Sequence, residues 1–223
     1  MDVNGLLRAL DGAVQLVRSD PADFIAHLQT HLELSGLALL MGVGLCFPLG
    51  VLASRSRWVS LYALNAFGIA RAVPSVAILF LAYPFLGLGF QPALLALAVL
   101  ACPPVLINTN VAFRAVDPAI REAAYGMGLT TVQVLSKIEL PLALPVVLAG
   151  VRTAAVEVIA SATLATFIGA GGLGDFINSG LSNLDTSLLL EGALPVALLT
   201  LTAEIVLGGL EMWSRQAAGV PRG

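Results

Sequence analysis

The longest uncharged stretch of the chain runs from Ala72 to Phe113 and holds no aspartate, glutamate, lysine or arginine. A second stretch, from Leu34 to Ser54, is equally free of charge. About 20 helical residues cross the hydrocarbon core of a bilayer, so the longer stretch holds one complete span and part of another. Only 11% of the 223 residues are charged, against about 25% in a typical soluble domain. The chain is therefore expected to be an all-α integral membrane protein.

Five apolar segments follow one another along the chain. They are expected to cross the membrane at about residues 31–53, 58–85, 92–113, 142–168 and 188–213. The second and third are separated at Gly87-Leu-Gly-Phe-Gln-Pro92, where turn residues precede a proline suited to a helix start. Pro74 lies inside the second segment, so its helix is expected to be kinked or broken near that residue.

Residues 1–30 are too polar for the bilayer core and are expected to form an extracytoplasmic amphipathic segment. Apolar residues recur there at helical spacing, at Val3, Leu6, Leu7, Leu10, Val14 and Val17. Asp20-Pro21 is expected to end this first helix and to start a second, short one.

Lysine and arginine near the span ends are concentrated on one side. The connections after the first and third spans and the C-terminal tail hold Arg55, Arg57, Arg114, Arg121, Lys137, Arg215 and Arg222. The connections at residues 87–91 and 169–187 hold no lysine or arginine, and residues 1–33 hold two arginines against five acidic residues. Because basic residues are enriched in cytoplasmic loops, we expect the N-terminus outside and the C-terminal tail, residues 214–223, in the cytoplasm.

Residues 114–141 form a polar, helix-prone segment between the third and fourth spans, on the cytoplasmic side. Asp117-Pro118 is a favourable helix start, because aspartate caps a helix and proline is tolerated at its first position. Glu122 then falls near the positive end of the helix dipole. Gly126 and Gly128 are expected to end this helix.

A second short helix is expected to start at Thr130 or Thr131, either of which can cap it, and to run through Lys137. Pro141 is then expected to begin the fourth span. The two short helices would lie in an L, and their alanine and glycine residues would permit the close approach that a docking element needs.

One pattern in this segment is specific. It reads Glu122-Ala-Ala124, three residues, Gly128, nine residues, and then Ile138-Glu-Leu-Pro141. It resembles the EAA coupling loop of permease subunits of type I ABC importers. Other segments resemble the osmoprotectant branch of these permeases, which moves glycine betaine, choline, carnitine or proline: Arg71-Ala-Val-Pro-Ser75, Asp117-Pro-Ala119, Leu140–Pro145, Ala149–Thr153 and Ala162–Gly174. The resemblance covers about residues 31–212.

This resemblance implies a five-helix type I ABC importer transmembrane domain at residues 31–213, embedded in the lipid of a bacterial inner membrane. Two permease subunits, identical or paralogous, would form the pathway, two cytoplasmic ATPases would bind their loops, and an extracytoplasmic binding protein would deliver the solute. The chain has no Walker A sequence, so we expect a transporter subunit without a cofactor, not an enzyme. The residues implied to couple to the ATPase are Arg121, Glu122, Ala123, Ala124, Tyr125, Gly128, Ile138 and Pro141.

A second set of residues is expected along the pathway or at its outer gate. It comprises Arg71, Pro74, Ser75, Glu157, Thr163, Gly169, Gly171, Gly172 and Gly174. Ionisable residues inside a span are costly and usually face a partner or a water-filled path. We therefore expect Arg71 and Glu157 to approach the pathway, as a pair or singly, with a purely structural pairing as the alternative. The glycines form either a flexible break at a helix end or the gate on which the binding protein docks.

Other interpretations have less support. His27 and His31 would share a helix face, but no third ligand accompanies them, so no metal site is expected. A permease for methionine or another amino acid is the alternative function. A non-transporting membrane protein or an intramembrane hydrolase is a more distant one, since polar catalytic groups within the spans are scarce. No nucleic-acid partner is expected.

Overall fold

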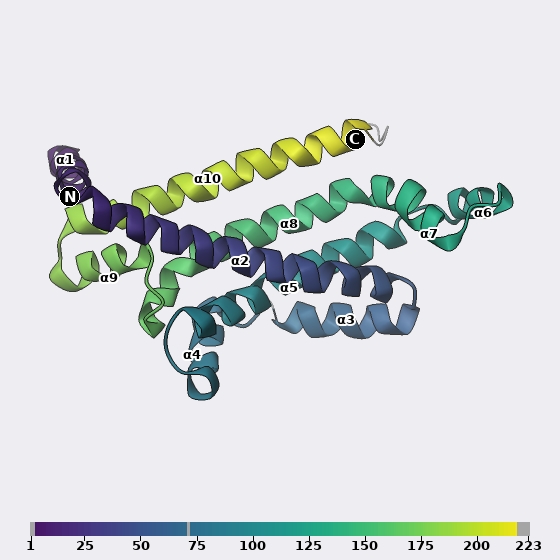
Figure 1. Cartoon of the computed structure of the whole chain (residues 1–223), viewed down its shortest axis with the longest axis horizontal. Helices are drawn as coiled ribbons and strands as arrows, with labels where there is room; N and C mark the ends of the chain where they lie inside the picture. Colours follow the sequence, from purple (N-terminus) through teal and green to yellow (C-terminus); the bar gives the residue numbers. More distant parts are fainter. Residues whose placement is uncertain (1–2, 71, 218–223) are drawn as a thin grey trace. The chain divides into compact units, whose positions relative to one another are not determined.

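The computed structural model describes residues 3–70 and 72–217, and every regular element in these ranges is helical (Figure 1). The α-helices are α1 Val3–Ser19, α2 Pro21–Ser54, α3 Arg57–Ala70, α4 Ser75–Leu86, α5 Phe90–Arg114, α6 Pro118–Gly126, α7 Thr131–Val134, α8 Leu140–Ala162, α9 Gly174–Asn183 and α10 Thr186–Ala217. A π-helical turn, Leu135–Glu139, joins α7 to α8, and a 3₁₀ helix, Thr163–Ile168, extends α8.

The chain forms two compact units. The described residues of the first lie within Met1–Leu40, Val73–Leu100 and Val156–Thr202. Those of the second lie within Met41–Ala72, Ala101–Ala155 and Ala203–Gly223. Each of the long helices α2, α5, α8 and α10 therefore contributes one part to each unit.

The core of the first unit joins α9 to parts of α2 and α10. Leu173, Phe176 and Val196 are buried together, and the partly buried side chains packed against them are Phe24, Leu28, Leu188 and Leu199. The rings of Phe24 and Phe176 stack with their centroids 6.3 Å apart. The sequence did not predict α9, which lies in what was expected to be a plain connection at residues 169–187.

The core of the second unit joins parts of α2, α5 and α8. Its buried residues are Ala112, Phe113, Ala143 and Val147, and the ring of Phe47 meets that of Phe113 edge to face at 6.2 Å. Two of the four buried residues are alanines, so the helices can approach closely. Small residues at helix contacts are typical of membrane proteins, in which van der Waals packing drives helix association.

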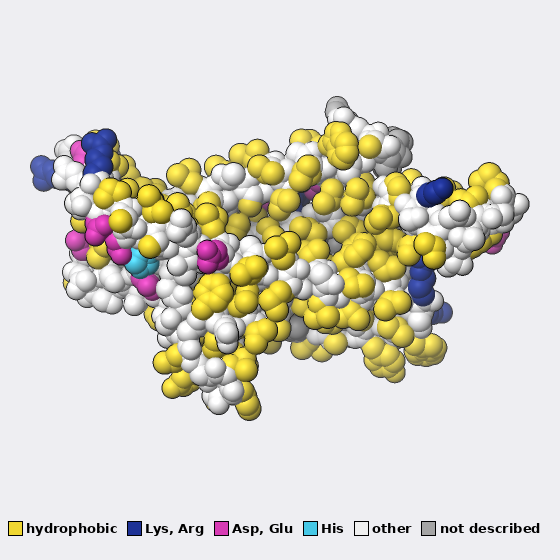
Figure 2. All heavy atoms as spheres, viewed as in Figure 1, with side chains coloured by type: hydrophobic (Ala, Val, Ile, Leu, Met, Phe, Trp, Pro, Cys, Tyr) yellow, Lys and Arg dark blue, Asp and Glu magenta, His cyan; other side chains and the backbone are white. Residues whose placement is uncertain are grey.

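The outer surface is largely apolar. Figure 2 shows hydrophobic side chains over most of the visible surface, and among the most exposed are Leu52, Trp58, Phe85, Leu198, Ile205 and Trp213. Helices Pro21–Ser54, Phe90–Arg114, Thr131–Ile168 and Thr186–Ala217 are long and apolar enough to cross a membrane. These surfaces are suited to lipid contact, which confirms the expected class of integral membrane protein.

The remaining expected span, at residues 58–85, is divided into α3 and α4. Pro74 caps α4, and its carbonyl accepts hydrogen bonds from the N–H groups of Ala77 and Ile78 at 2.9 and 3.2 Å. Proline has no N–H to continue a preceding helix, so it starts the second piece instead. The break expected at this proline is confirmed.

The start of α2 corrects one prediction. Asp20 accepts a hydrogen bond from the N–H of Asp23 at 3.0 Å, and the helix begins at Pro21 as expected. The prediction that this helix is short is wrong, because it continues for 34 residues to Ser54. No capping or turn signal interrupts it near residue 31, and Pro48 is accommodated inside it.

Candidate functional site

The segment between α5 and α8 begins with the predicted helix. The Asp117 side chain accepts a hydrogen bond from the N–H of Ala119 at 2.9 Å, and Pro118 is the first residue of α6. The helix ends at Gly126. Gly128 follows with φ of 82°, a left-handed backbone conformation that residues other than glycine rarely adopt. The expected start and end of this helix are confirmed.

The second helix of this segment starts as predicted but continues further. Thr130 and Gln133 form a capping box, in which the Thr130 N–H donates to the Gln133 side chain at 2.9 Å. The helix does not stop at Lys137, and Pro141 does not begin a separate span. The π-helical turn carries the chain directly from α7 into α8. Such a turn lets a helix accept a proline, because the backbone groups that proline leaves unbonded are satisfied locally.

A buried carboxylate lies at the base of the segment. Glu139 is 1% exposed and belongs to the π-helical turn. Arg55, in the connection between α2 and α3, holds it as a bidentate partner, with Nη1 donating to Oε1 at 2.8 Å. Arg121 of α6 approaches the same carboxylate, with Nε 2.6 Å from Oε1. Its Nη2 also donates to the carbonyl of Phe113 at the end of α5.

This network fixes three separate segments on one side chain. A buried charge is tolerated only when it is paired and hydrogen-bonded, so Glu139 requires both arginines to stay close. The hydrogen bond to Glu139 also raises the pKa of Arg55, which stays charged. We name Arg55, Arg121 and Glu139 the anchor of the loop. Sequence reasoning did not single out Glu139, because it fills the variable position of the Ile-x-Leu-Pro pattern. A charged residue bordering an apolar span is the signal that could have found it.

The anchor changes the interpretation of two residues predicted to couple to an ATPase. The guanidinium of Arg121 is directed into the anchor, although its side chain stays 26% exposed, and Ala124 is only 1% exposed. The side chain of Ala124 is therefore not available for direct contact in this conformation. The other predicted coupling residues remain accessible, in full or in part: Glu122, Ala123, Tyr125, Gly128, Ile138 and Pro141.

The segment between α5 and α8 also exposes several large apolar side chains. Ile120 and Tyr125 of α6, Met127 after it and Val132 of α7 are all exposed, Met127 by 71%. Glu122 lies among them on α6. An exposed cluster of large apolar side chains on a polar segment is typical of a protein-binding surface. We name these residues, with Glu122, the loop surface.

The predicted outer glycines lie in a packed turn of the first unit. Gly169, Gly171 and Gly172 have φ of 72°, 77° and 91°. A side chain added at Gly174 would place its Cβ only 2.1 Å from the carbonyl oxygen of Thr163. Close backbone packing therefore holds the turn at Gly174, whereas a Cβ added at Gly169 would meet nothing within 4 Å.

Hydrogen bonds tie the same turn to its surroundings. The N–H of Gly89 donates to the carbonyl of Ile168 at 2.7 Å, and the Thr166 hydroxyl bonds the carboxylate of Asp175. That carboxylate also lies 3.5 Å from Nε2 of His27. His31 is buried nearby, with Nε2 3.2 Å from the carbonyl of Ile159. Among the described residues no group of three His, Cys, Asp or Glu side chains could hold a metal ion.

The predicted intramembrane charges are only partly described. Arg71 lies outside the described residues, so its pairing with Glu157 of α8 stays a prediction. Arg152 of α8 lies 3.4 Å from both Glu204 and Glu211 of α10. Pro74 and Ser75 mark the start of α4.

Comparison with known proteins identifies the family. The model described as "Binding-protein-dependent transport system inner membrane component" matches residues 46–215, which is most of the chain. The chain belongs to this family. A binding-protein-dependent permease of this kind is a multi-pass membrane subunit of a transporter, not an enzyme.

Relatives of this permease align over nearly its whole length. The carnitine transport permease protein OpuCB of Listeria monocytogenes is 41% identical over 202 residues, which are 91% of this chain and 93% of that protein. The choline transport system permease protein OpuBB of Bacillus subtilis (strain 168) is 36% identical over 198 residues, or 89% and 91% of the two chains.

A solved structure supports the fold. A chain of the MetNI methionine ABC transporter in an inward-facing conformation matches with a TM-score of 0.74 and 20% identity, covering 86% of this permease and 96% of that chain. The permease therefore has the fold of type I ABC importer permeases, as the resemblance implied. At this identity the likeness concerns the fold alone.

Proposed function

We propose that this permease imports a compatible solute of the glycine betaine, choline, carnitine or proline type. The observation that carries the proposal is the identity of 36–41% to permeases named for carnitine and choline, over about nine-tenths of the chain. The likeness to the methionine transporter does not favour methionine as the substrate, because at 20% identity it concerns the fold.

The loop surface supports a role in energy coupling. In this proposal the segment of residues 114–141 lies in the cytoplasm and docks on a separate ATPase through Glu122, Tyr125 and Met127. The anchor holds α6 against the permease, so that force applied to the docked helix reaches α8 through the π-helical turn. Arg121 and Ala124 position the loop from within.

The proposed cycle is one of alternating access. ATP closes the two ATPases, moves the loops of two permease subunits, and opens the pathway between those subunits to the outside. An extracytoplasmic binding protein delivers the solute, with the packed glycine turn at residues 169–174 on that side. Hydrolysis resets the inward-facing state. In this orientation the N-terminal segment, residues 1–30, is extracytoplasmic and the end of α10 is cytoplasmic.

Uptake by the reconstituted transporter tests the substrate. The permease is placed in vesicles with its ATPase and binding protein, and accumulation of labelled glycine betaine, choline, carnitine, proline and methionine is compared with ATP and without it. We expect ATP-dependent accumulation of at least one compatible solute and none of methionine. Uptake of methionine alone would overturn the proposal.

Co-purification tests the docking role. Glu122→Lys reverses a charge on the loop surface and is expected to abolish recovery of the ATPase with the permease, together with ATP-driven uptake. Glu33→Lys is the matched control, because Glu33 is an exposed acid of α2 outside the loop. If Glu122→Lys retains ATPase and uptake at the level of this control, the loop surface is not the docking element.

A further inference from the structure

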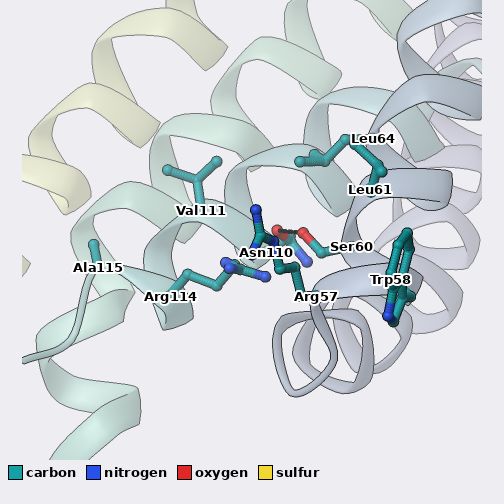
Figure 3. Close-up of a pocket in the computed structure, with 9 residues that line it drawn as sticks. All are labelled: Arg57, Trp58, Ser60, Leu61, Leu64, Asn110, Val111, Arg114 and Ala115. Atoms are coloured by element: carbon teal, nitrogen blue, oxygen red, sulfur yellow. Dashed lines mark hydrogen bonds between the residues drawn. The ribbon is translucent and has the colours of Figure 1, made fainter. Parts of the chain in front are cut away.

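A large cavity lies in the second unit, and neither the loop surface nor the glycine turn contributes a residue to its described lining. It has a volume of about 920 Å³. Its lining comes from α3, from the C-terminal part of α5 and from Ala115, which follows α5 (Figure 3). This volume is within the range of about 300–1,000 Å³ that is usual for ligand sites. Nothing in the proposed transport cycle uses it.

The cavity carries an unbalanced positive charge. In Figure 3 the side chains of Arg57 and Arg114 extend toward Asn110 from the two helices. Neither guanidinium has an ion-pair partner among the described residues, and none of the nine described residues that line the cavity is acidic. Two arginines that converge without a carboxylate form a site suited to an anion, in particular a phosphate.

A buried amide joins the two helices at the cavity. Asn110 is fully buried, and its Oδ1 accepts a hydrogen bond from the Ser60 hydroxyl at 2.8 Å. The two guanidiniums are the charged donors that this lining offers to an anionic oxygen.

The rest of the lining is suited to an amphipathic occupant. Trp58 is 68% exposed at the cavity, and Leu61, Leu64 and Val111 provide apolar walls. Tryptophan is enriched where membrane meets water, at the level of lipid headgroups. Arg114 is the last residue of the apolar helix Phe90–Arg114, which is long enough to cross the membrane. The cavity therefore combines an anion site with an apolar wall at the end of a spanning helix.

We propose that this cavity binds the phosphodiester headgroup of an anionic phospholipid, with Arg57 and Arg114 on the phosphate and an acyl chain along the apolar wall. Basic pockets between membrane helices bind such headgroups in this way. The proposal needs only the membership of the permease family and is independent of the transported solute.

Fluorescence of Trp58 tests the proposal at the site itself. The chain has two tryptophans, so Trp213→Phe leaves Trp58 as the only one. This chain is reconstituted in phosphatidylcholine vesicles that contain an equal small fraction of either brominated phosphatidylglycerol or brominated phosphatidylcholine, and quenching is compared. We expect the anionic lipid to quench more strongly. Arg57→Gln and Arg114→Gln are each expected to lower the relative affinity for it by about fivefold.

Lys137→Gln is the matched control, because it removes one exposed positive charge outside the cavity and should leave the lipid preference unchanged. Equal quenching by the two lipids in the parent chain would overturn the proposal. Loss of the preference for the anionic lipid when inorganic phosphate replaces chloride at the same ionic strength would also overturn the proposal. The site would then bind free phosphate. Protection of Trp58 from both lipids would indicate that a second subunit covers the cavity, and would overturn it as well.

Discussion

The anchor of the loop and the packed glycine turn perform similar structural tasks by opposite means. In the anchor, three segments meet on one buried carboxylate, and charge holds them together. In the glycine turn, the chain reverses after the 3₁₀ helix through three left-handed glycines, and Gly174 packs directly on a backbone carbonyl. The contrast teaches that a charged residue can fix distant segments of a membrane protein where polar partners are available. In the glycine turn the absence of a side chain at Gly174 serves the same purpose, together with hydrogen bonds such as that between Thr166 and Asp175.

The largest expected effect comes from removing the centre of the anchor. Glu139→Ala should lower the free energy of unfolding by about 3 kcal/mol, because two arginines that converge on a buried site lose their counter-charge. Thermal unfolding of the purified permease in detergent measures the loss. Glu33→Ala, at an exposed acid, is expected to change stability by less than about 0.5 kcal/mol. An equal effect of the two substitutions would show that charge does not hold the anchor.

A double-mutant cycle sharpens the same point. Arg121→Ala, Glu139→Ala and the double variant are expected to give a coupling energy of about 1–3 kcal/mol, because the two side chains are in contact. The unfolding midpoints of the four proteins give this energy. Simple additivity of the two single effects would contradict the 2.6 Å contact between Nε and Oε1.

The next largest effect is expected in the glycine turn. Gly174→Ala should cost about 2 kcal/mol, because its Cβ meets a backbone oxygen at 2.1 Å and the backbone cannot move aside freely. Gly36→Ala is the matched control, since nothing lies within 4 Å of a Cβ added in that helix. The control is expected to be neutral or to stabilise the protein by about 0.5 kcal/mol. A neutral result at Gly174 would mean that the turn is loosely packed.

The smallest effect tests a glycine in the loop. Gly128→Ala should cost about 1 kcal/mol, because its φ of 82° is unfavourable for alanine although there is space for the side chain. Gly128→Asn should cost less, since asparagine tolerates this conformation better. Comparison of the two unfolding midpoints separates backbone strain from packing. An equal loss of stability in the alanine and asparagine variants would indicate that the left-handed backbone conformation is not the cause.

The local features of the loop were predictable from the sequence because their causes are local. Asp117 caps α6 from two residues away, and Thr130 caps α7 from three. The break at Pro74 follows from the chemistry of one residue. A reader of the sequence needs only a short window to find each of these signals.

The errors arose where distant residues or an unusual helical turn decide the structure. Arg55 and Glu139 are 84 positions apart, so no window of sequence reveals that they meet. Pro141 was predicted to start a separate helix. The π-helical turn that accommodates this proline within a continuous helix has no recognised sequence signal. The helix α9 was missed because the glycines before it resemble those of a loop, although Phe176 packs in the core of its unit.

The π-helical turn between α7 and α8 has a consequence for insertions and deletions. Such a turn holds one residue more than an α-helical turn, and each α-helical residue turns the helix by about 100°. Loss of a single residue from Leu135–Glu139 would therefore rotate the preceding helices, α6 included, by roughly a quarter of a turn relative to α8. The angular setting of α6 relative to α8 then depends on one inserted residue.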